Sequence, residues 1–174
     1  EGEVEWAKAI GGNATDSIKS VAVSADGGYI VGGYFSSSTI ELDNGTTLTN
    51  KGSYDGMLIK YDIDGNIEWT KVIGGSSDDR IQTVAVSSDG GYIVGGRFSS
   101  RTIELEKGIT LTNKGSDDGM VIKYDIDGNI EWAKGIGGDK EDYIISVAVS
   151  ADGGYIVGGY FESSTIELSD EITL

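Results

Sequence analysis

The hydrophobic and polar positions of this chain follow a pattern that repeats every 63 residues. All three tryptophans occupy one position of this repeat and all three phenylalanines another: Trp6, Trp69, Trp132, Phe35, Phe98 and Phe161. A fixed period of this length is typical of a solenoid, a propeller or another repeat array. We therefore divide a single repeat domain, 1–174, into units 1–63, 64–126 and an incomplete 127–174.

Within each unit, short apolar stretches lie between glycine-rich turn signals, a pattern that predicts β-strands. Valine, isoleucine, threonine and tyrosine dominate these stretches, as they do on half-buried pleated surfaces. No stretch of useful length has a helical period. In the middle unit the expected main strands are 67–73, 81–87, 92–98 and 120–124, with a small hairpin of 102–105 and 109–112 added to one edge of the sheet.

Four antiparallel strands joined by tight turns form the blade of a β-propeller. We therefore expect an all-β fold of propeller-type blades, with four antiparallel strands and an added hairpin in each 63-residue repeat. The 81–87 strand should lie innermost. Paired glycines such as Gly95-Gly96 should let neighbouring blades approach closely, and the tryptophans should fill the space between blades.

The strand count predicts an incomplete ring, because it gives two full blades and parts of others, whereas propellers close with about four to eight. The first strand, around Trp6, would belong to a blade whose other members lie elsewhere. Three explanations stay open: a piece of a longer propeller, several copies that complete one ring, or copies joined head to tail through open sheet edges. Since the sequence begins at Glu1 without a methionine, we expect a processed product or an excised fragment.

Three motifs carry a family resemblance: Trp69-Thr-Lys-Val-Ile-Gly-Gly, Val84-Ala-Val-Ser-Ser-Asp-Gly-Gly-Tyr-Ile-Val-Gly-Gly and Asp118-Gly-Met-Val-Ile-Lys-Tyr-Asp. They resemble bacterial β-propeller repeats of the SBBP type, which occur in secreted and cell-surface proteins. Asp62-Ile-Asp-Gly-Asn-Ile-Glu-Trp69 is also similar to the repeats of quinoprotein-like propellers, but nothing here matches their cofactor-binding residues. The resemblance implies a propeller fold and an extracellular or cell-surface location, and it implies little about activity.

Composition removes several functions. A net charge of −16 repels phosphate backbones and anionic membranes, so we expect no nucleic-acid partner. No apolar run approaches 18 residues, so we expect no membrane insertion. The chain lacks cysteine and histidine, which excludes thiolate chemistry and a Ser-His-Asp triad. Almost every acid has a copy in the next unit, so no carboxyl pair stands out for glycoside hydrolysis. We expect no enzyme activity and assign no catalytic residue.

One aspartate recurs in every unit after the Gly-Gly that ends the tryptophan strand, at Asp16, Asp79 and Asp142. In a propeller, the loop that carries it opens near the mouth of the central channel. These carboxylates are therefore candidates for a ring that attracts cations or a basic ligand. The alternative is that each one accepts backbone N–H bonds and fixes its own loop.

Two loops place alternating carboxylate oxygens before a glycine, as calcium loops do. These weak metal candidates are Asp62 and Asp64 in one loop and Asp125 and Asp127 in the other. An EF-hand loop ends in a glutamate, but isoleucine occupies the matching positions here, so an Asp-Gly hairpin turn explains the pattern better. Apart from calcium, we expect no cofactor and no metal.

A few positions differ between units, and repeat proteins bind partners through such variable positions on a fixed scaffold. Arginine occurs only in the middle unit, where Arg97 replaces the tyrosine of the two other units. The candidates for a partner surface are Tyr34, Arg80, Arg97, Arg101 and Tyr160. Drift on a solvated surface would produce the same variation.

These patterns predict a non-catalytic extracellular β-propeller repeat scaffold for adhesion or for protein or glycan binding. One alternative is a structural subunit that self-assembles through open blade edges into a ring or filament. A second is a fragment of a propeller enzyme, such as a glycoside hydrolase, whose catalytic acids lie on other blades.

Overall fold

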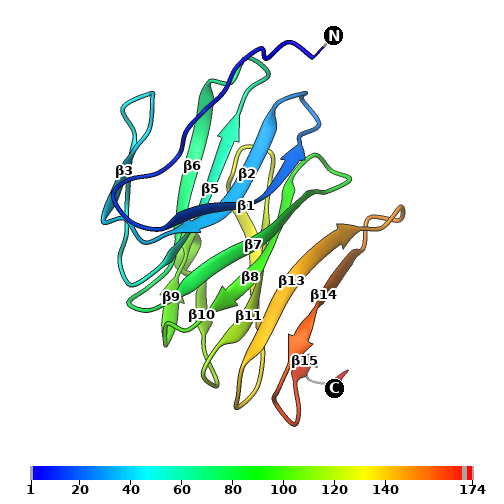
Figure 1. Ribbon diagram of the computed structural model, residues 1–174. Coiled ribbons are helices and arrows are strands. Elements are labelled where there is room, and N and C mark those ends of the chain that lie inside the picture. The colour runs from blue at the N-terminus through cyan, green and yellow to red at the C-terminus, as the bar shows by residue number, and fades with distance from the viewer. Residues whose placement is uncertain (1, 170–171, 174) are drawn as a thin grey trace.

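The computed structural model describes residues 2–169, 172 and 173. Its elements are β-strands, apart from a single turn of 3-10 helix, η1, at Glu106–Gly108. Four-stranded antiparallel sheets repeat along the chain, and none of the described sheets closes into a barrel (Figure 1). The predicted all-β fold with an incomplete ring of propeller-type blades is confirmed. Among the described residues, no helix is long and apolar enough to cross a membrane.

Each complete blade takes three strands from one sequence unit and its outermost strand from the next. Blade 1 has the order β1 (Asp16–Val23), β2 (Tyr29–Phe35), β5 (Asp55–Tyr61) and β6 (Ile67–Ile73). Blade 2 has the order β7 (Asp79–Val86), β8 (Tyr92–Phe98), β11 (Asp118–Tyr124) and β12 (Ile130–Ile136). Blade 3 contains the pair β13 (Asp142–Val149) and β14 (Tyr155–Phe161).

The extra hairpin of each unit forms a two-stranded sheet of its own. The pairs are β3 (Thr39–Glu41) with β4 (Thr47–Thr49), β9 (Thr102–Glu104) with β10 (Thr110–Thr112), and β15 (Glu167–Ser169) with β16 (Ile172–Thr173). The prediction that the hairpin extends one edge of the blade sheet is wrong. Ile103 and Leu111 are buried in the same cluster as Phe98, so the second hairpin packs against its blade through these side chains.

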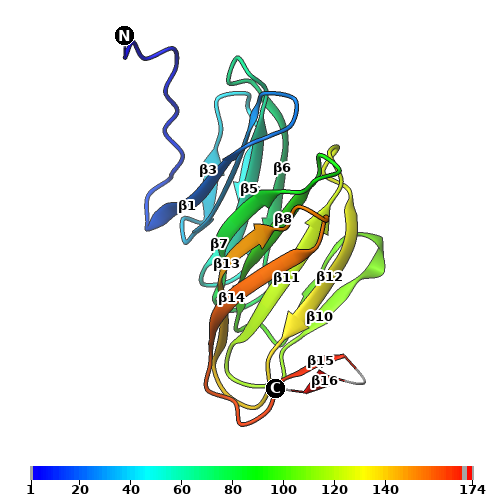
Figure 2. The same cartoon turned by 90° about the vertical axis from the view of Figure 1, so that its right-hand side faces the viewer.

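Two sequence predictions about strands need adjustment. Strands β6 and β8 have the predicted bounds, whereas β7 and β11 begin two residues earlier, each at an aspartate. Residues 2–15 form no strand, although one was predicted around Trp6. Figure 2 shows this segment as an extended coil beside blade 1. No described strand pairs with residues 2–15.

The blades pack through their innermost strands, β1, β7 and β13, which lie side by side (Figure 1). Side-chain hydroxyls join these strands: Ser20 Oγ accepts a hydrogen bond from the backbone N–H of Val84 at 3.1 Å. Thr83 Oγ1, at the next equivalent position, accepts one from the N–H of Val147 at 3.3 Å. The predicted innermost position of the 81–87 strand agrees with these contacts.

In the first two pairs, only the first glycine faces the next blade. A Cβ atom at Gly95 would be 2.8 Å from Cγ2 of Ile144 in blade 3. The second glycine is required within its own blade, because a Cβ atom at Gly96 would lie 2.0 Å from the backbone oxygen of Arg80 on the paired strand. That close approach coincides with the register shift between Ile81 and Thr83, where β7 bulges against β8.

Trp69 and Trp132 lie between blades, as predicted, whereas Trp6 packs on Tyr29 and Tyr61 of blade 1 from the segment that forms no strand. Trp69 belongs to the outermost strand of blade 1, and its ring packs on blade 2 at 5.6 Å from Tyr92 and 6.5 Å from Tyr124 (ring centroids). Trp132 repeats the first of these contacts, at 5.8 Å from Tyr155. Aromatic pairs of this kind stabilise beyond the area they bury.

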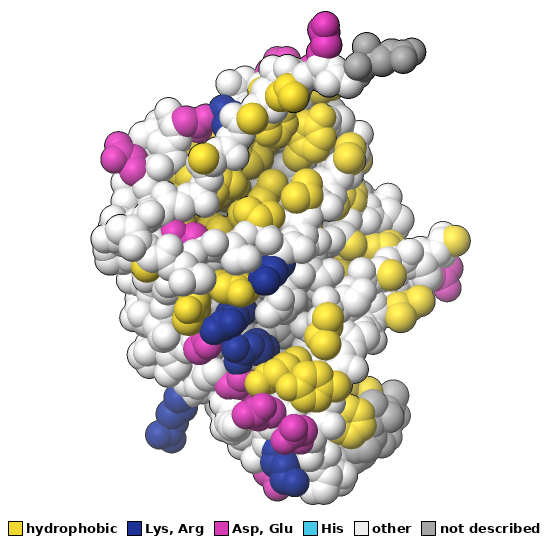
Figure 3. Space-filling model, viewed as in Figure 1, with side chains coloured by type: hydrophobic (Ala, Val, Ile, Leu, Met, Phe, Trp, Pro, Cys, Tyr) yellow, Lys and Arg dark blue, Asp and Glu magenta, His cyan; other side chains and the backbone are white. Residues whose placement is uncertain are grey.

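Both end faces of the blade array are apolar and exposed. On β1, the side of Val21 that would face a preceding blade is open, and 59% of the residue is accessible, against 6% for the equivalent Val84. At the other end, Ile156 of β14 is exposed, while the equivalent Ile93 of blade 2 is covered by blade 3. Figure 3 shows hydrophobic side chains gathered on the visible face of the molecule.

Candidate binding surface at the inner-strand rim

The variable positions of the repeat meet at one rim of the blade array, where the inner strands begin. In each blade the second residue of the inner strand lies directly opposite a residue of the next strand. The pairs are Ser17 with Tyr34, Arg80 with Arg97, and Tyr143 with Tyr160. Together with the ionic partners described below, these side chains form a strip that crosses both blade junctions. We call it the rim strip.

Arg80 occupies the junction between blades 1 and 2. Its guanidinium lies 4.7 Å from the ring centre of Tyr34 and 4.1 Å from that of Tyr54, both of which belong to the preceding repeat. Asp78 fixes it through two hydrogen bonds of 2.6 Å, from Nε and from Nη2. Bidentate pairing and stacking together hold an arginine in one orientation. Arg80 is therefore a fixed part of this surface.

Arg97 lies at the junction between blades 2 and 3, at the repeat position that Tyr34 occupies one unit earlier. It is hydrogen-bonded to Asp117 and lies 3.3 Å from Oδ2 of Asp78, so Asp78 connects the two arginines. Its guanidinium also lies 4.9 Å from the ring centre of Tyr143. The Tyr143 ring in turn packs edge-on against Tyr160 at 4.7 Å. The strip thus continues without a break to blade 3.

Backbone contacts between blades hold the strip in register. Tyr54 forms a parallel bridge with Asp78, and the N–H of Asp79 donates to the carbonyl of Tyr54 at 2.7 Å. Asp117 and Glu141 repeat the bridge one unit later. Variable side chains are therefore presented by an invariant backbone.

Charges within the strip change the ionisation of its tyrosines. Burial opposes ionisation of Tyr34, but the hydrogen bond and charge of Lys19, together with the charge of Arg80, lower the pKa of its hydroxyl. Burial raises the pKa of Tyr143, and so does the hydrogen bond that its hydroxyl donates to Glu141 at 2.9 Å. Figure 3 shows basic and acidic side chains side by side on this face.

Four of the five predicted partner-surface residues come together here: Tyr34, Arg80, Arg97 and Tyr160. Arg101 does not belong to the group, because it is exposed in the connection from β8 to β9. The strip also contains Tyr54, Asp78, Asp117 and Tyr143, which were not among the predicted partner-surface residues. Each of them differs between units, so each carries the same sequence signal as the predicted ones.

The recurrent aspartates are loop-fixing residues and do not form a free ring of carboxylates. Asp79 is 0% exposed, and it accepts hydrogen bonds from the N–H of Gly75 at 2.7 Å and from the hydroxyl of Ser100 at 2.6 Å. Asp16 and Asp142 receive the same set from their own loops. Their lone pairs are used by these donors, which is why the residue recurs unchanged.

The metal candidates lie in hairpin turns. Asp62 accepts hydrogen bonds from the backbone and side-chain nitrogens of Asn66, at 2.7 and 2.9 Å, and Asp125 accepts the same pair from Asn129. Asp64 and Asp127 follow in these same turns. Within the described part of the chain, no three acidic side chains come together in a group that could hold a metal ion.

Two further acids sit at the blade junctions. Asp55 and Asp118 are fully buried, and one carboxyl oxygen of each, Oδ1, has no hydrogen-bond partner. Burial raises the pKa of Asp55 to about 6, and the nearby charge of Asp79 adds to the effect. Burial likewise raises the pKa of Asp118, beside Asp142. Sequence analysis did not foresee these carboxyl pairs, because their members are far apart along the chain.

Comparison with known proteins agrees with a propeller-like repeat and goes no further. No protein-family model matches the chain. It is 26% identical over 159 residues to an uncharacterized WD repeat-containing protein of Acanthamoeba polyphaga mimivirus, covering 84% of this chain and 11% of that protein. It is 29% identical over 115 residues to the regulatory protein FlaEY of Caulobacter vibrioides, covering 65% of this chain and 12% of FlaEY. The chain therefore spans about an eighth of each relative or less. The likeness to SBBP-type repeats therefore stays a resemblance and does not assign the chain to that family.

Proposed function

We propose that this chain is a non-catalytic propeller repeat scaffold, exposed outside the cell, that binds a protein or glycan partner through the rim strip. The observation that carries the proposal is the gathering of variable residues at one rim, over an unvarying backbone. Tyrosine and arginine, the residues that vary there, are enriched in protein interfaces. The flat tyrosine faces also suit a sugar ring.

The likeness to a WD-repeat protein and to a protein named as regulatory supports a role in binding rather than chemistry. The net charge of −16 favours a basic or neutral partner over an acidic one. The resemblance to SBBP-type repeats supports the extracellular location.

The repeat itself supplies conservative variants for the test. Arg80→Ser introduces the residue of the first unit, and Arg97→Tyr introduces the residue of the two other units. Arg101→Ser is the matched control, because serine occupies its equivalent positions and Arg101 lies outside the rim strip. Wild type and variants would be probed on a glycan array and against a panel of purified basic proteins.

The proposal predicts a glycan or protein signal that the Arg80→Ser, Arg97→Tyr double variant loses and the Arg101→Ser variant keeps. If the double variant keeps the signal, the partner binds outside the rim strip. If neither array shows any signal above background, the proposed binding function is wrong.

A second candidate function is self-assembly, favoured by the two exposed apolar end faces. The space beside Gly95 of blade 2 is occupied by the side chain of Val147 of blade 3. At the equivalent Gly158, nothing lies within 4 Å of an added Cβ atom. Val21, the counterpart of Val147, is exposed at the opposite end of the same chain. One copy therefore carries both halves of the junction.

Cysteine cross-linking tests this candidate, because the chain has no cysteine of its own. Mixing Gly158→Cys protein with Val21→Cys protein under mild oxidation should give a disulfide-linked pair. Gly158→Cys mixed with Val84→Cys should not, since Val84 is buried in a junction already made. A single monomeric species in both mixtures would exclude head-to-tail assembly.

A further inference from the structure

In blade 3, the edge of β14 that faces away from β13 is not paired with another described strand. The residues that would surround an added strand there are already present. Val157 of β14 is 39% exposed, while the equivalent Val94 of β8 is 0% exposed and packs in one cluster with Met120 and Ile122 of β11. Phe161 is 51% exposed, against 0% for Phe98. In blade 2, every residue of β8 pairs with one of β11, from Phe98 with Asp118 to Tyr92 with Tyr124.

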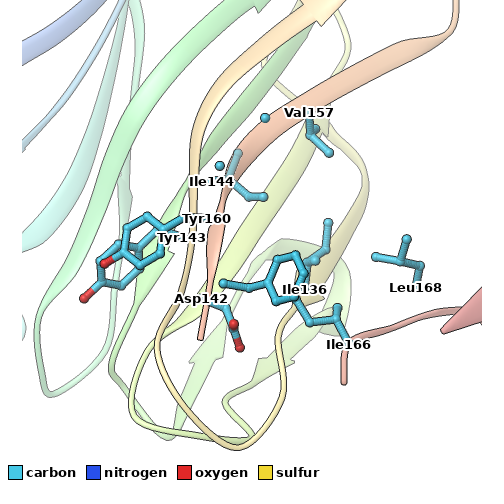
Figure 4. A pocket seen from close by; sticks show the side chains of 11 residues that line it. Ile136, Asp142, Tyr143, Ile144, Val157, Tyr160, Ile166 and Leu168 are labelled. Carbon is cyan, nitrogen blue, oxygen red and sulfur yellow. The ribbon is translucent and has the colours of Figure 1, made fainter. Parts of the chain in front are cut away.

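A hollow lies where the next strand would run. Its volume is about 350 Å³, and its apolar lining comes from blade 2, blade 3 and the third hairpin (Figure 4). The apolar lining residues are Ile136, Ile144, Val157, Phe161, Ile166 and Leu168. Their equivalents one unit earlier pack in a single cluster with Met120 of β11. The hollow therefore has the place and the chemistry to receive a methionine side chain.

A second hollow of about 240 Å³ continues the first along the face of blade 2. It is lined by Val121, Trp132 and Tyr155, among others. One junction earlier, the equivalents of the first two, Leu58 and Trp69, pack in one cluster with Ile122 and Tyr124. The second hollow thus matches the apolar and aromatic residues that follow the methionine in β11.

An ionic half-site marks the end of the same edge. In blades 1 and 2, a buried lysine of the third strand pairs with the aspartate of the Asp-Gly-Gly turn and with a glutamate of the fourth strand. For Lys123, Nζ lies 3.0 Å from Asp89 and 2.9 Å from Glu131. Lys60 does the same with Asp26 and Glu68.

Asp152 is the equivalent turn aspartate of blade 3. It accepts the same hydrogen bonds as its counterparts, from the hydroxyl of Ser150 and from the N–H of Gly154. Among the described residues of blade 3, no lysine or arginine pairs with it. The acceptor carboxylate is therefore preformed, and its partner cation would come from an added strand.

We propose that the edge of β14 is an acceptor for a β-hairpin with the sequence pattern of β11–β12. The added strand pairs antiparallel with β14 in the register of β11 with β8. Its methionine enters the larger hollow, its tyrosine stacks near Trp132, and its lysine reaches Asp152. Strand addition of this kind draws affinity from backbone hydrogen bonds and specificity from alternate side chains.

A peptide that spans residues 116–137 of this chain is the probe, and the complete 174-residue chain is the receptor. Fluorescence polarisation of the labelled peptide gives the affinity, and backbone amide exchange locates the site. We expect saturable binding that protects the amides of β14. A peptide with Lys123→Gln should bind about tenfold more weakly, since a charged hydrogen bond is lost. One with Met120→Asp should bind more weakly still.

Receptor variants identify the lysine's partner. In Asp152→Asn receptor, the wild-type and Lys123→Gln peptides should bind with nearly equal affinity. The matched control is Asp89→Asn, whose carboxylate already pairs with the receptor's own Lys123, so the tenfold difference should persist. The proposal fails if the wild-type peptide does not bind at concentrations up to ~1 mM. It also fails if a scrambled peptide binds as well, or if the difference survives in Asp152→Asn.

Discussion

A Cβ atom added at Gly32 would lie 2.6 Å from Cγ1 of Val84, across the junction between blades 1 and 2. Real Cβ atoms do not approach so closely, so the glycine is required by the neighbouring blade. Gly158 occupies the same position of blade 3, and a Cβ there would meet nothing within 4 Å. One repeat position thus exists in a packed and an open environment within a single chain.

Gly32→Ala should lower the free energy of unfolding by about 1–3 kcal/mol, because the added methyl overpacks the junction. Gly158→Ala should leave it unchanged or raise it by up to about 1 kcal/mol, since alanine reduces the entropy of the unfolded chain. Urea denaturation of both variants checks this. Equal losses in the two variants would mean that strand geometry, rather than blade packing, selects glycine here.

The buried carboxyl Asp55 should make stability fall as pH rises. Its pKa is about 6 in the folded protein and 3.8 in its unperturbed state, so the folded state holds the extra proton. The stability it contributes is fully present below about pH 4 and lost as pH passes 6, a change of about 3 kcal/mol. Denaturation of Asp55→Asn at pH 4.5 and 7.5 should show that this part of the pH dependence is gone. An unchanged difference between the two pH values would contradict the assignment.

The aspartates of the Asp-Gly-Gly turns should have the opposite effect on the pH dependence of stability. The hydroxyl of Ser24 and the ammonium of Lys60 lower the pKa of Asp26 to about 2. A lowered folded pKa gives stability that is present above about pH 4 and lost as pH falls toward 2. Asp26→Asn should therefore flatten the acid side of the stability profile, and Asp89→Asn should do the same, because its pKa is also about 2. Acid unfolding identical to wild type in both variants would refute this.

Removing Arg80 should cost little stability. Its stacking on Tyr34 and Tyr54 occurs at a partly exposed rim, where a cation–π contact contributes about 0.5–1 kcal/mol. With two such contacts, Arg80→Ser should unfold within about 2 kcal/mol of wild type, so that a loss of binding reports on the surface rather than on the fold. Thermal melting measures this, and a loss of several kcal/mol would show that the rim strip is structural.

The period of the repeat was enough to predict the blade, since strands between Gly-rich turns have few ways to pack once they recur with a fixed spacing. The interblade tryptophans and the inner strand followed from the same pattern. The hairpin was misplaced because its two short strands look like edge strands in sequence, whereas the burial of Ile103 and Leu111 against the blade appears only in three dimensions.

The rim strip was only partly predictable. Variation between units identified Arg80 and Arg97, but not that Asp78 joins them, because residues 78 and 97 meet only when β7 pairs with β8. Arg101 carried the same signal and lies outside the strip. Variation shows which positions are free to change, and the fold decides which of them share a surface.

Radial packing of equivalent blades is the central claim, and a disulfide across the second junction tests it most directly. A Cβ at Gly95 would lie 2.9 Å from Cγ1 of Val147, so side chains at these two positions face each other directly, as a disulfide requires. In the double variant Gly95→Cys, Val147→Cys, mild oxidation should give one intramolecular disulfide in a folded monomer, detected by peptide mass mapping. A folded monomer whose two thiols stay free would contradict the blade packing described here.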